Sequence, residues 1–299
     1  MSHFTVLVIG SDPEAQLAPY HEFECTGVDD QYVVDVDKTD KVRADYDAAS
    51  GMSLVEWASD YYGWPVKKAS DPRSEAHTYG FIEVDDAGEL VRAVDRTNPQ
   101  KKWDWYQLGG RWTGFFKLKK GANGEVGSPG LMTSQAKPGY ADAVRKGDVD
   151  WAGMITDIVN ERLLRFDAAL AIIEKYGRPR PWKDILAEYG EDKINDARAV
   201  YGTQPAVAAL RKAHLDPWSA TLEEEYTNFD RDAFIAVNSK TAVHTHAVVK
   251  DGKWYEKGEM GFFGVCHDEM TDDQWDVEFQ KLIDGLPEDT LLSVYDCHI

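Results

Sequence analysis

"HFTVLVIG", residues 3–10, is the stretch that decides the fold of this chain. Its run of apolar and β-branched residues, which ends at Gly10, is typical of a buried β-strand. The last residues of the sequence, "TLLSVYDCHI" (290–299), have the same character and follow Pro287. We therefore predict a strand at each end of the chain, and we expect the two strands to be neighbours in one sheet.

A helical region separates the two strand-rich ends. Its clearest helix is predicted to begin near Trp151, because apolar residues recur at helical spacing over 155–173 until Gly177 ends the pattern. Further helices are predicted over 182–198 and 204–213. The expected fold class is α+β, with a mixed or antiparallel sheet built from the N- and C-terminal strands and with an inserted helical subdomain. The predicted parts of the chain are 1–150, 151–215 and 216–299.

Shorter elements follow from turn signals and local periodicity. The Asp251-Gly252 pair between two apolar runs predicts a hairpin, and the stretch after Thr271 predicts an amphipathic helix with Trp275 and Phe279 on one face. The remaining expectations are a helix over 52–63, two strands within 78–97, a strand over 110–122, a long loop over 127–150 and a strand over 261–267.

The net charge of −20 is the strongest global feature of the 299-residue sequence. Acidic residues dominate the two end regions, 1–60 and 216–299, whereas the middle of the chain is close to neutral. Such a surface repels nucleic-acid phosphates, so direct binding of DNA or RNA is not expected. The charge serves solubility, or it lets the chain compete with nucleic acid for a basic surface of another protein.

Cysteine content and hydropathy predict a cytoplasmic protein. Three cysteines cannot form a disulfide framework, which favours a reducing compartment. The sequence has no run of about 18 apolar residues, so we predict no membrane span and no membrane partner. Its first residues lack the basic and apolar regions of a signal peptide. The aromatic content permits a homo-oligomer without requiring one.

"KWDWYQLGGRWTGFF" (102–116) concentrates large aromatic residues around a glycine pair and an arginine. Paired glycines bring backbone N–H groups close to a ligand, arginine offers a planar charged fork for phosphate or carboxylate, and tryptophan offers a stacking surface. The stretch is therefore either core packing around a tight turn or the wall of an anion site. The predicted ligand-binding residues are Trp103, Trp105, Tyr106, Gly109, Gly110, Arg111 and Trp112.

Asp296 and His298 are the predicted catalytic residues. They lie two apart and so share one face of the last strand, where a carboxylate could hold the imidazole in one tautomer for acid–base chemistry. The alternative is a structural hydrogen-bonded pair that closes the end of the sheet.

Histidine and cysteine residues also gather in the last third of the sequence. His244 and His246 could share a strand face, but the neighbouring Cys266 and His267 point in opposite directions on a regular strand. We therefore predict no metal site, and nothing in the sequence names a cofactor. The glycine fingerprints of nucleotide-binding folds and the motifs of serine esterases and zinc proteases are absent.

Five stretches together resemble an uncharacterised protein family found in phages, prophages and bacterial genomes. They are "MSHFTV" (1–6), "LAPYHE" (17–22), "KWDWYQLGGRW" (102–112), "DGKWYEKGEMGFFG" (251–264) and "YDCHI" (295–299). The resemblance implies a mobile-element setting, and hence a host-cell cytoplasm, and it carries over no catalytic residue.

Two hypotheses about function result. In the first hypothesis, a pocket lined by arginine and tryptophan binds a small anionic, nucleotide-like ligand. One version of this hypothesis adds that the protein also processes the ligand. In the second, the chain is an acidic, non-enzymatic inhibitor of the anti-defence or host-takeover kind, which docks on a basic nucleic-acid-binding surface of a host or defence protein. Both depend on where Arg111 and His298 lie in the fold.

Overall fold

The computed structural model describes residues 2–22, 30–71, 79–131, 133–215, 226, 230–238, 243–261 and 264–299. The chain is an α+β protein that divides into two compact units. Unit 1 comprises Met1–Val149 and His244–Ile299 and carries the strands, whereas unit 2 comprises Asp150–Val243 and is helical. The helical unit thus interrupts the strand-bearing one, and it extends past the predicted insertion of 151–215.

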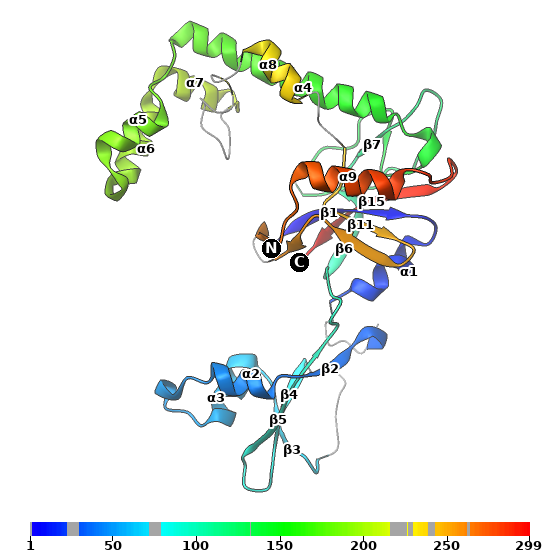
Figure 1. Cartoon of the computed structure of the whole chain (residues 1–299), viewed down its shortest axis with the longest axis vertical. Coiled ribbons are helices and arrows are strands. Elements are labelled where there is room, and N and C mark those ends of the chain that lie inside the picture. Colours follow the sequence, from blue (N-terminus) through cyan, green and yellow to red (C-terminus); the bar gives the residue numbers. More distant parts are fainter. Residues whose placement is uncertain are drawn as a thin grey trace. The chain divides into compact units, whose positions relative to one another are not determined.

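The two terminal strands are direct neighbours in the main sheet of unit 1, as predicted (Figure 1). β1 (His3–Ile9) runs antiparallel to β15 (Leu291–His298), and the register pairs His3 with His298. The sheet order is β12-β11-β1-β15-β6-β8, and β10 also pairs with β15. The other strands are β6 (Trp105–Gly110), β8 (Ser128–Pro129), β10 (Ala143–Arg145), β11 (Ala247–Lys250) and β12 (Lys253–Glu256). β1 and β11 are parallel, so the sheet is mixed.

The two faces of the main sheet differ in character because strand residues alternate between them. One face packs the apolar cluster of Phe4, Val6, Val8, Leu17, Tyr20, Trp103, Ala247, Val249 and Cys297. Leu17 and Tyr20 come from α1 (Pro13–Leu17) and the 3-10 turn Ala18–Tyr20. The other face carries His3, Asp296 and His298, near the start of β1 and the end of β15.

α9 (Asp272–Ile283) forms where the sequence predicts an amphipathic helix, and it lies along the main sheet in Figure 1. A capping box between Thr271 and Gln274 begins the helix and satisfies its first N–H groups. Its apolar stripe, which includes Trp275 and Phe279, is buried, and Trp275 Nε1 donates to the carbonyl of Thr245 at 2.7 Å.

Unit 1 also holds a four-stranded sheet with its own core. The strand order is β2-β5-β4-β3, formed by β2 (Val34–Asp37), β3 (Val66–Lys68), β4 (Gly80–Val84) and β5 (Leu90–Thr97). α2 (Thr39–Asp45) and α3 (Leu54–Tyr62) supply Val42 and Trp57 to its apolar cluster. The predicted helix over 52–63 and the two strands within 78–97 are confirmed.

The prediction for residues 105–150 is wrong in two places. The regular strand of this region is β6, which ends with the glycine pair, and only β7 (Phe116–Lys117) forms after it within the predicted strand over 110–122. Gly109 and Gly110 have φ of 76° and 55°, a conformation that ends a strand. The predicted loop over 127–150 contains β8, β9 (Tyr140–Ala141) and β10.

The hairpin at Asp251-Gly252 joins β11 and β12 as predicted, and both turn residues have positive φ. Within the predicted strand over 261–267, β14 (Cys266–His267) is short and pairs with β13 (Glu259–Met260). Residues 262–263 of that prediction lie outside the described part of the chain.

Unit 2 is built on α4 (Trp151–Tyr176), which begins and ends as the sequence predicts. Asp150 caps it by accepting from Gly153 N at 3.0 Å, and Gly177 ends it. The region 182–198 forms two helices because Gly190, with φ of 78°, separates them. The shorter helices are α5 (Trp182–Tyr189), α6 (Ile194–Thr203), α7 (Pro205–Lys212) and α8 (Arg231–Asn238). Among the helices described, none is long and apolar enough to cross a membrane.

Candidate functional site

Two aspartate–histidine pairs lie side by side at one end of the central strands of the main sheet, where β1 begins and β15 ends. His3 Nδ1 is 2.7 Å from Asp296 Oδ1, and His298 Nδ1 is 2.7 and 2.8 Å from the two oxygens of Asp104. Each carboxylate can only accept, so each Nδ1 carries a proton and each Nε2 is the nitrogen left for chemistry. The predicted catalytic residues Asp296 and His298 therefore share a face, but each has a different partner from the one expected.

The aromatic rings bring the two pairs into one cluster. The His3 and His298 rings meet edge to face with centroids 4.9 Å apart. Trp105 stacks on His298 at 5.1 Å and 16°, and it meets His3 at 5.3 Å and 80°. Trp105 is 43% exposed, whereas the His298 and Asp296 side chains are nearly buried. We call His3, Asp104, Trp105, Asp296 and His298 the histidine cluster.

Sequence reasoning missed His3 and Asp104. The register pairs His3 with His298, and it places Trp105 opposite His298 on the other side of β15. Long-range pairing, which no local pattern specifies, thus assembles the cluster. The one available signal was the histidine near each end of the chain, combined with the prediction that the terminal strands are neighbours.

Carboxylates of the same chain occupy the space beside the glycine pair. A Cβ on Gly109 would lie 2.6 Å from Asp142 Oδ2, and a Cβ on Gly110 would collide with Cβ and Oδ2 of Asp296. Asp142 is fully buried and accepts from three backbone N–H groups, those of Gly114, Phe115 and Gly127, at 2.6, 3.1 and 2.8 Å. The lack of a side chain at Gly109 and Gly110 therefore leaves room for Asp142 and Asp296.

Arg111 directly follows β6 and is exposed. Its backbone N donates to Asp296 Oδ2 at 2.9 Å, so Asp296 joins the arginine backbone to His3. Trp112 is half-buried in the turn that follows, where its backbone N donates to the carbonyl of Gly109. No pocket among those described includes Arg111 together with His298.

Trp103 and Tyr106 belong to the apolar face of the main sheet. Trp103 is buried, stacks on His21 at 4.5 Å, and donates from Nε1 to the carbonyl of Leu17. Together they line a pocket of about 410 Å³, whose other walls are Asp12, Glu14, Ala15, Ala18 and His21. The predicted ligand-binding residues therefore divide between the two faces, with Trp105 on one and this pocket on the other.

The histidines and cysteines of the last third do not converge. His244 pairs with Asp276, whereas His246 Nε2 lies 2.9 Å from the carbonyl of Gly258, and burial lowers the pKa of His246. Cys297 is fully buried, and burial raises its thiol pKa well above the ordinary value. Within the described ranges, no group of three or more His, Cys, Asp and Glu residues could hold a metal ion. Cys25 lies outside those ranges.

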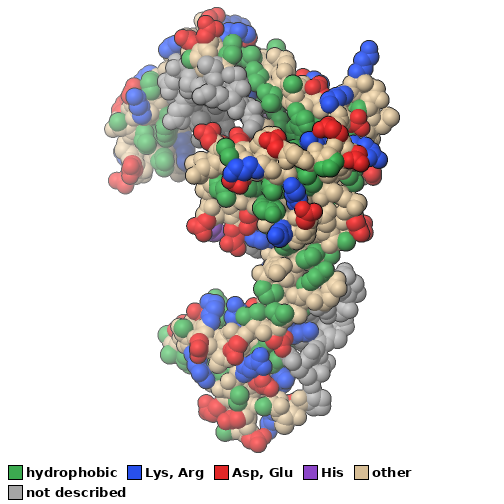
Figure 2. Space-filling model, turned by 45° about the vertical axis from the view of Figure 1, so that its right-hand side comes forward, with side chains coloured by type: hydrophobic (Ala, Val, Ile, Leu, Met, Phe, Trp, Pro, Cys, Tyr) green, Lys and Arg blue, Asp and Glu red, His purple; other side chains and the backbone are tan. Residues whose placement is uncertain are grey.

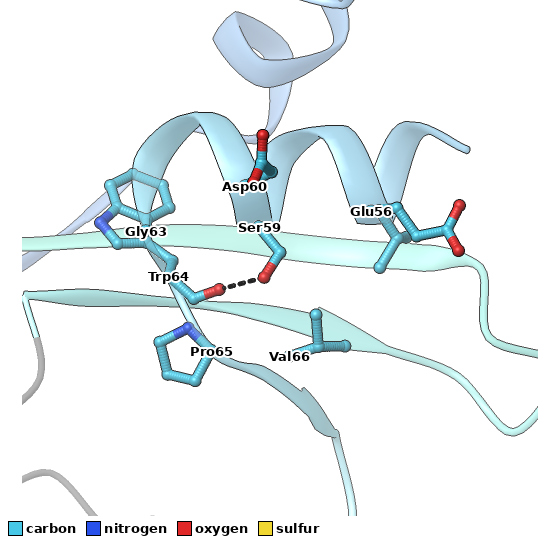
Figure 3. Close-up of a pocket in the computed structure, with 8 residues that line it drawn as sticks. Glu56, Ser59, Asp60, Gly63, Trp64, Pro65 and Val66 are labelled. Atoms are coloured by element: carbon cyan, nitrogen blue, oxygen red, sulfur yellow. Dashed lines mark hydrogen bonds between the residues drawn. The ribbon is translucent and has the colours of Figure 1, made fainter. Parts of the chain in front are cut away.

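Another pocket, of about 620 Å³, lies beside the four-stranded sheet and contains none of the predicted site residues (Figure 3). Ser59 Oγ donates to the carbonyl of Trp64 at 2.7 Å, and Pro65 and Val66 complete this wall. The carboxylates of Glu56 and Asp60 point away from Pro65 and Val66 in Figure 3. This pocket therefore offers less chemistry than the histidine cluster.

Tyr295 gives a pH-dependent test of the apolar face. Burial, with neighbouring Tyr106, raises its pKa from 10.0 to about 12, so folding favours the protonated phenol. Its contribution to stability is complete below pH 10 and is lost as the pH rises towards 12, because the unfolded chain ionises first. We expect Tyr295→Phe to show a smaller decrease in unfolding free energy between about pH 9 and about pH 11 than the wild type in urea titrations. Equal decreases in the two proteins would contradict this.

No protein-family model, no curated protein and no solved structure matches this chain. The resemblance to a phage-associated family therefore stays a prediction from the sequence, and the site is interpreted from its own geometry.

Proposed function

We propose that this protein binds a small anionic, nucleotide-like ligand at the histidine cluster. The observation that carries the proposal is the position of Trp105, a 43% exposed indole stacked beside two aspartate–histidine pairs. An exposed indole is a surface on which a nucleobase stacks with a gain of about 1–3 kcal/mol. Aromatic exposure next to groups that can exchange protons is typical of a ligand site.

Arg111 supplies the positive charge in this proposal. Its backbone is fixed to Asp296 and its side chain is exposed, and in this proposal the guanidinium binds a ligand phosphate as a bidentate donor. Protonation of either imidazole would add charge of the same sign next to the carboxylates of Asp104 and Asp296. The anion would therefore meet a guanidinium and two imidazoles.

Calorimetric titration with nucleoside phosphates and cyclic dinucleotides tests the proposal. We expect Trp105→Ala to weaken binding by about 5-fold to 100-fold, the loss of one stacking contact. Arg111→Ala should weaken binding of phosphorylated ligands but not of the matching nucleosides. Tyr61→Ala and Arg198→Ala are matched controls, since both residues are exposed and lie outside the cluster. The proposal fails if no member of the panel binds, or if the controls weaken binding as much.

A second candidate function is docking on a basic partner protein, as in the inhibitor hypothesis. The 410 Å³ pocket favours it, because Asp12 and Glu14 supply negative charge beside the rings of Trp103 and Tyr106. Such a pocket suits a lysine or arginine side chain through charge and cation–π attraction. On the face drawn in Figure 2, acidic and basic side chains are interspersed, so the argument depends on this pocket.

Binding of an arginine-rich peptide at two salt concentrations tests this second candidate. We expect binding that weakens with salt and that Glu14→Gln reduces, whereas Glu191→Gln, on unit 2, leaves it unchanged. Binding that ignores both salt and Glu14 would contradict it. A cytoplasmic location and a mobile-element origin accompany either candidate as proposals from the sequence.

A further inference from the structure

We infer that His3 and His298 form a general acid–base pair that cleaves a phosphodiester bond of the bound nucleotide. The inference rests on the proposed function and adds a reaction to it. Each ring is fixed by a carboxylate on Nδ1, at 2.7 Å from Asp296 and 2.7 Å from Asp104. Both rings are therefore oriented with Nε2 as the nitrogen that exchanges protons.

Both Nε2 atoms remain available to a ligand. Among the residues the structure describes, no hydrogen bond is made by Nε2 of His3 or of His298. Neither atom is among the side-chain nitrogens and oxygens that are shut off from solvent without a partner. The two ring nitrogens are thus not completely enclosed, although the histidine side chains are only 11% and 6% exposed.

The two imidazole rings are direct neighbours. Their centroids are 4.9 Å apart, and in this proposal the two imidazoles act on different oxygens of the same phosphorus. Diester cleavage needs both actions, because the attacking hydroxyl must lose a proton and the leaving oxygen must gain one. A single histidine would supply only one of them in the same step.

The step balances without a further reagent. Neutral Nε2 of one histidine takes the proton of a hydroxyl, from water or a ribose, as its oxygen forms a bond to phosphorus. The P–O bond to the leaving group breaks, and the other histidine, protonated on Nε2, gives its proton to that oxygen. Proton exchange with water then restores both rings. The electron pair of the broken bond stays on the leaving oxygen, and no redox change occurs.

A thiol nucleophile is not part of this chemistry. Cys297 is next to both Asp296 and His298 in sequence, but it points to the opposite face of β15 and is fully buried. Burial raises the pKa of its thiol well above the ordinary value, so little thiolate forms at neutral pH. The histidine pair is therefore the reactive feature at this end of the sheet.

The test incubates the full chain with dinucleoside monophosphates and cyclic dinucleotides and separates the products by chromatography. We expect cleavage by the wild type, and a decrease of at least about 100-fold in His3→Asn and in His298→Asn. Asparagine keeps a donor where Nδ1 was, so its bond to Asp296 or Asp104 can survive while Nε2 is lost. Calorimetry on both variants should still detect the ligand, and His267→Ala, an exposed histidine on β14, should cleave at the wild-type rate.

Two results separate this inference from the proposed function. Wild-type protein that binds a nucleotide of the panel and forms no product overturns the acid–base pair and leaves the binding proposal standing. Cleavage that survives in folded His3→Asn or His298→Asn protein overturns it as well. Partial recovery of the rate of either variant by added imidazole would support it, because a merely structural role would not respond.

Discussion

Alanine at position 110 is expected to lower the free energy of unfolding by about 3 kcal/mol or more. Gly110 has φ of 55°, a conformation that costs an L-residue about 1–2 kcal/mol. A Cβ there would also collide with Cβ and Oδ2 of Asp296, a side chain that is 1% exposed. Asp296 cannot give way without losing its bonds to His3 and Arg111 N. Urea unfolding of Gly110→Ala measures this loss.

Gly121→Ala is the matched control for Gly110→Ala. Gly121 also has positive φ, 85°, but nothing lies within 4 Å of the Cβ it would carry. It reports the backbone cost alone, about 1–2 kcal/mol, and the excess in Gly110→Ala measures the collision with Asp296. Equal effects of the two substitutions would show that Asp296 does not restrict position 110. Gly110→Ala should also lose nucleotide binding, because the collision displaces Asp296, the residue that holds His3.

The main strands and helices could be predicted because their signals are local. The apolar runs at 3–10 and 290–299 mark buried strands, and the stripe over 155–173 marks α4. The pairing of the two terminal strands could be predicted as well, since two strand-like ends of one domain commonly meet in a sheet. The sequence does not predict β6, which ends with the glycine pair, because its aromatic residues are equally typical of the wall of a ligand site.

The cluster itself could be predicted only in part. Asp296 and His298 share a face by strand alternation alone, which is a local property. Their partners, His3 and Asp104, come from β1 and from the residue before β6, and only the register of three strands brings them there. The same alternation, applied to Trp105 and Tyr106, would have placed these neighbours on opposite faces. The division of the aromatic stretch between two faces was therefore available from the sequence.

Asparagine at position 142 is the second substitution for which we expect a large loss of stability, about 3 kcal/mol. Asp142 is fully buried, and both of its carboxylate oxygens accept backbone hydrogen bonds. An asparagine has the same shape but only one accepting oxygen, so its NH₂ group must face Gly127 N or the N–H groups of Gly114 and Phe115. At least one buried donor is then left without an acceptor. Thermal and urea unfolding of Asp142→Asn measure the cost.

Asp85→Asn is the control, because Asp85 makes the same kind of bonds in water. Its Oδ1 accepts from the backbone N of Ala87 and of Glu89 at 2.9 Å, on an exposed turn. Because solvent can replace either bond, we expect Asp85→Asn to lower the free energy of unfolding by less than about 1 kcal/mol. Similar losses at both positions would mean that burial does not set the cost at Asp142.

Because Gly109 packs on Asp142 and Gly110 on Asp296, the loss of stability in Asp142→Asn should also be smaller in a Gly110→Ala background than in the wild type. Strict additivity would show that the two carboxylates stabilise the glycine turn independently.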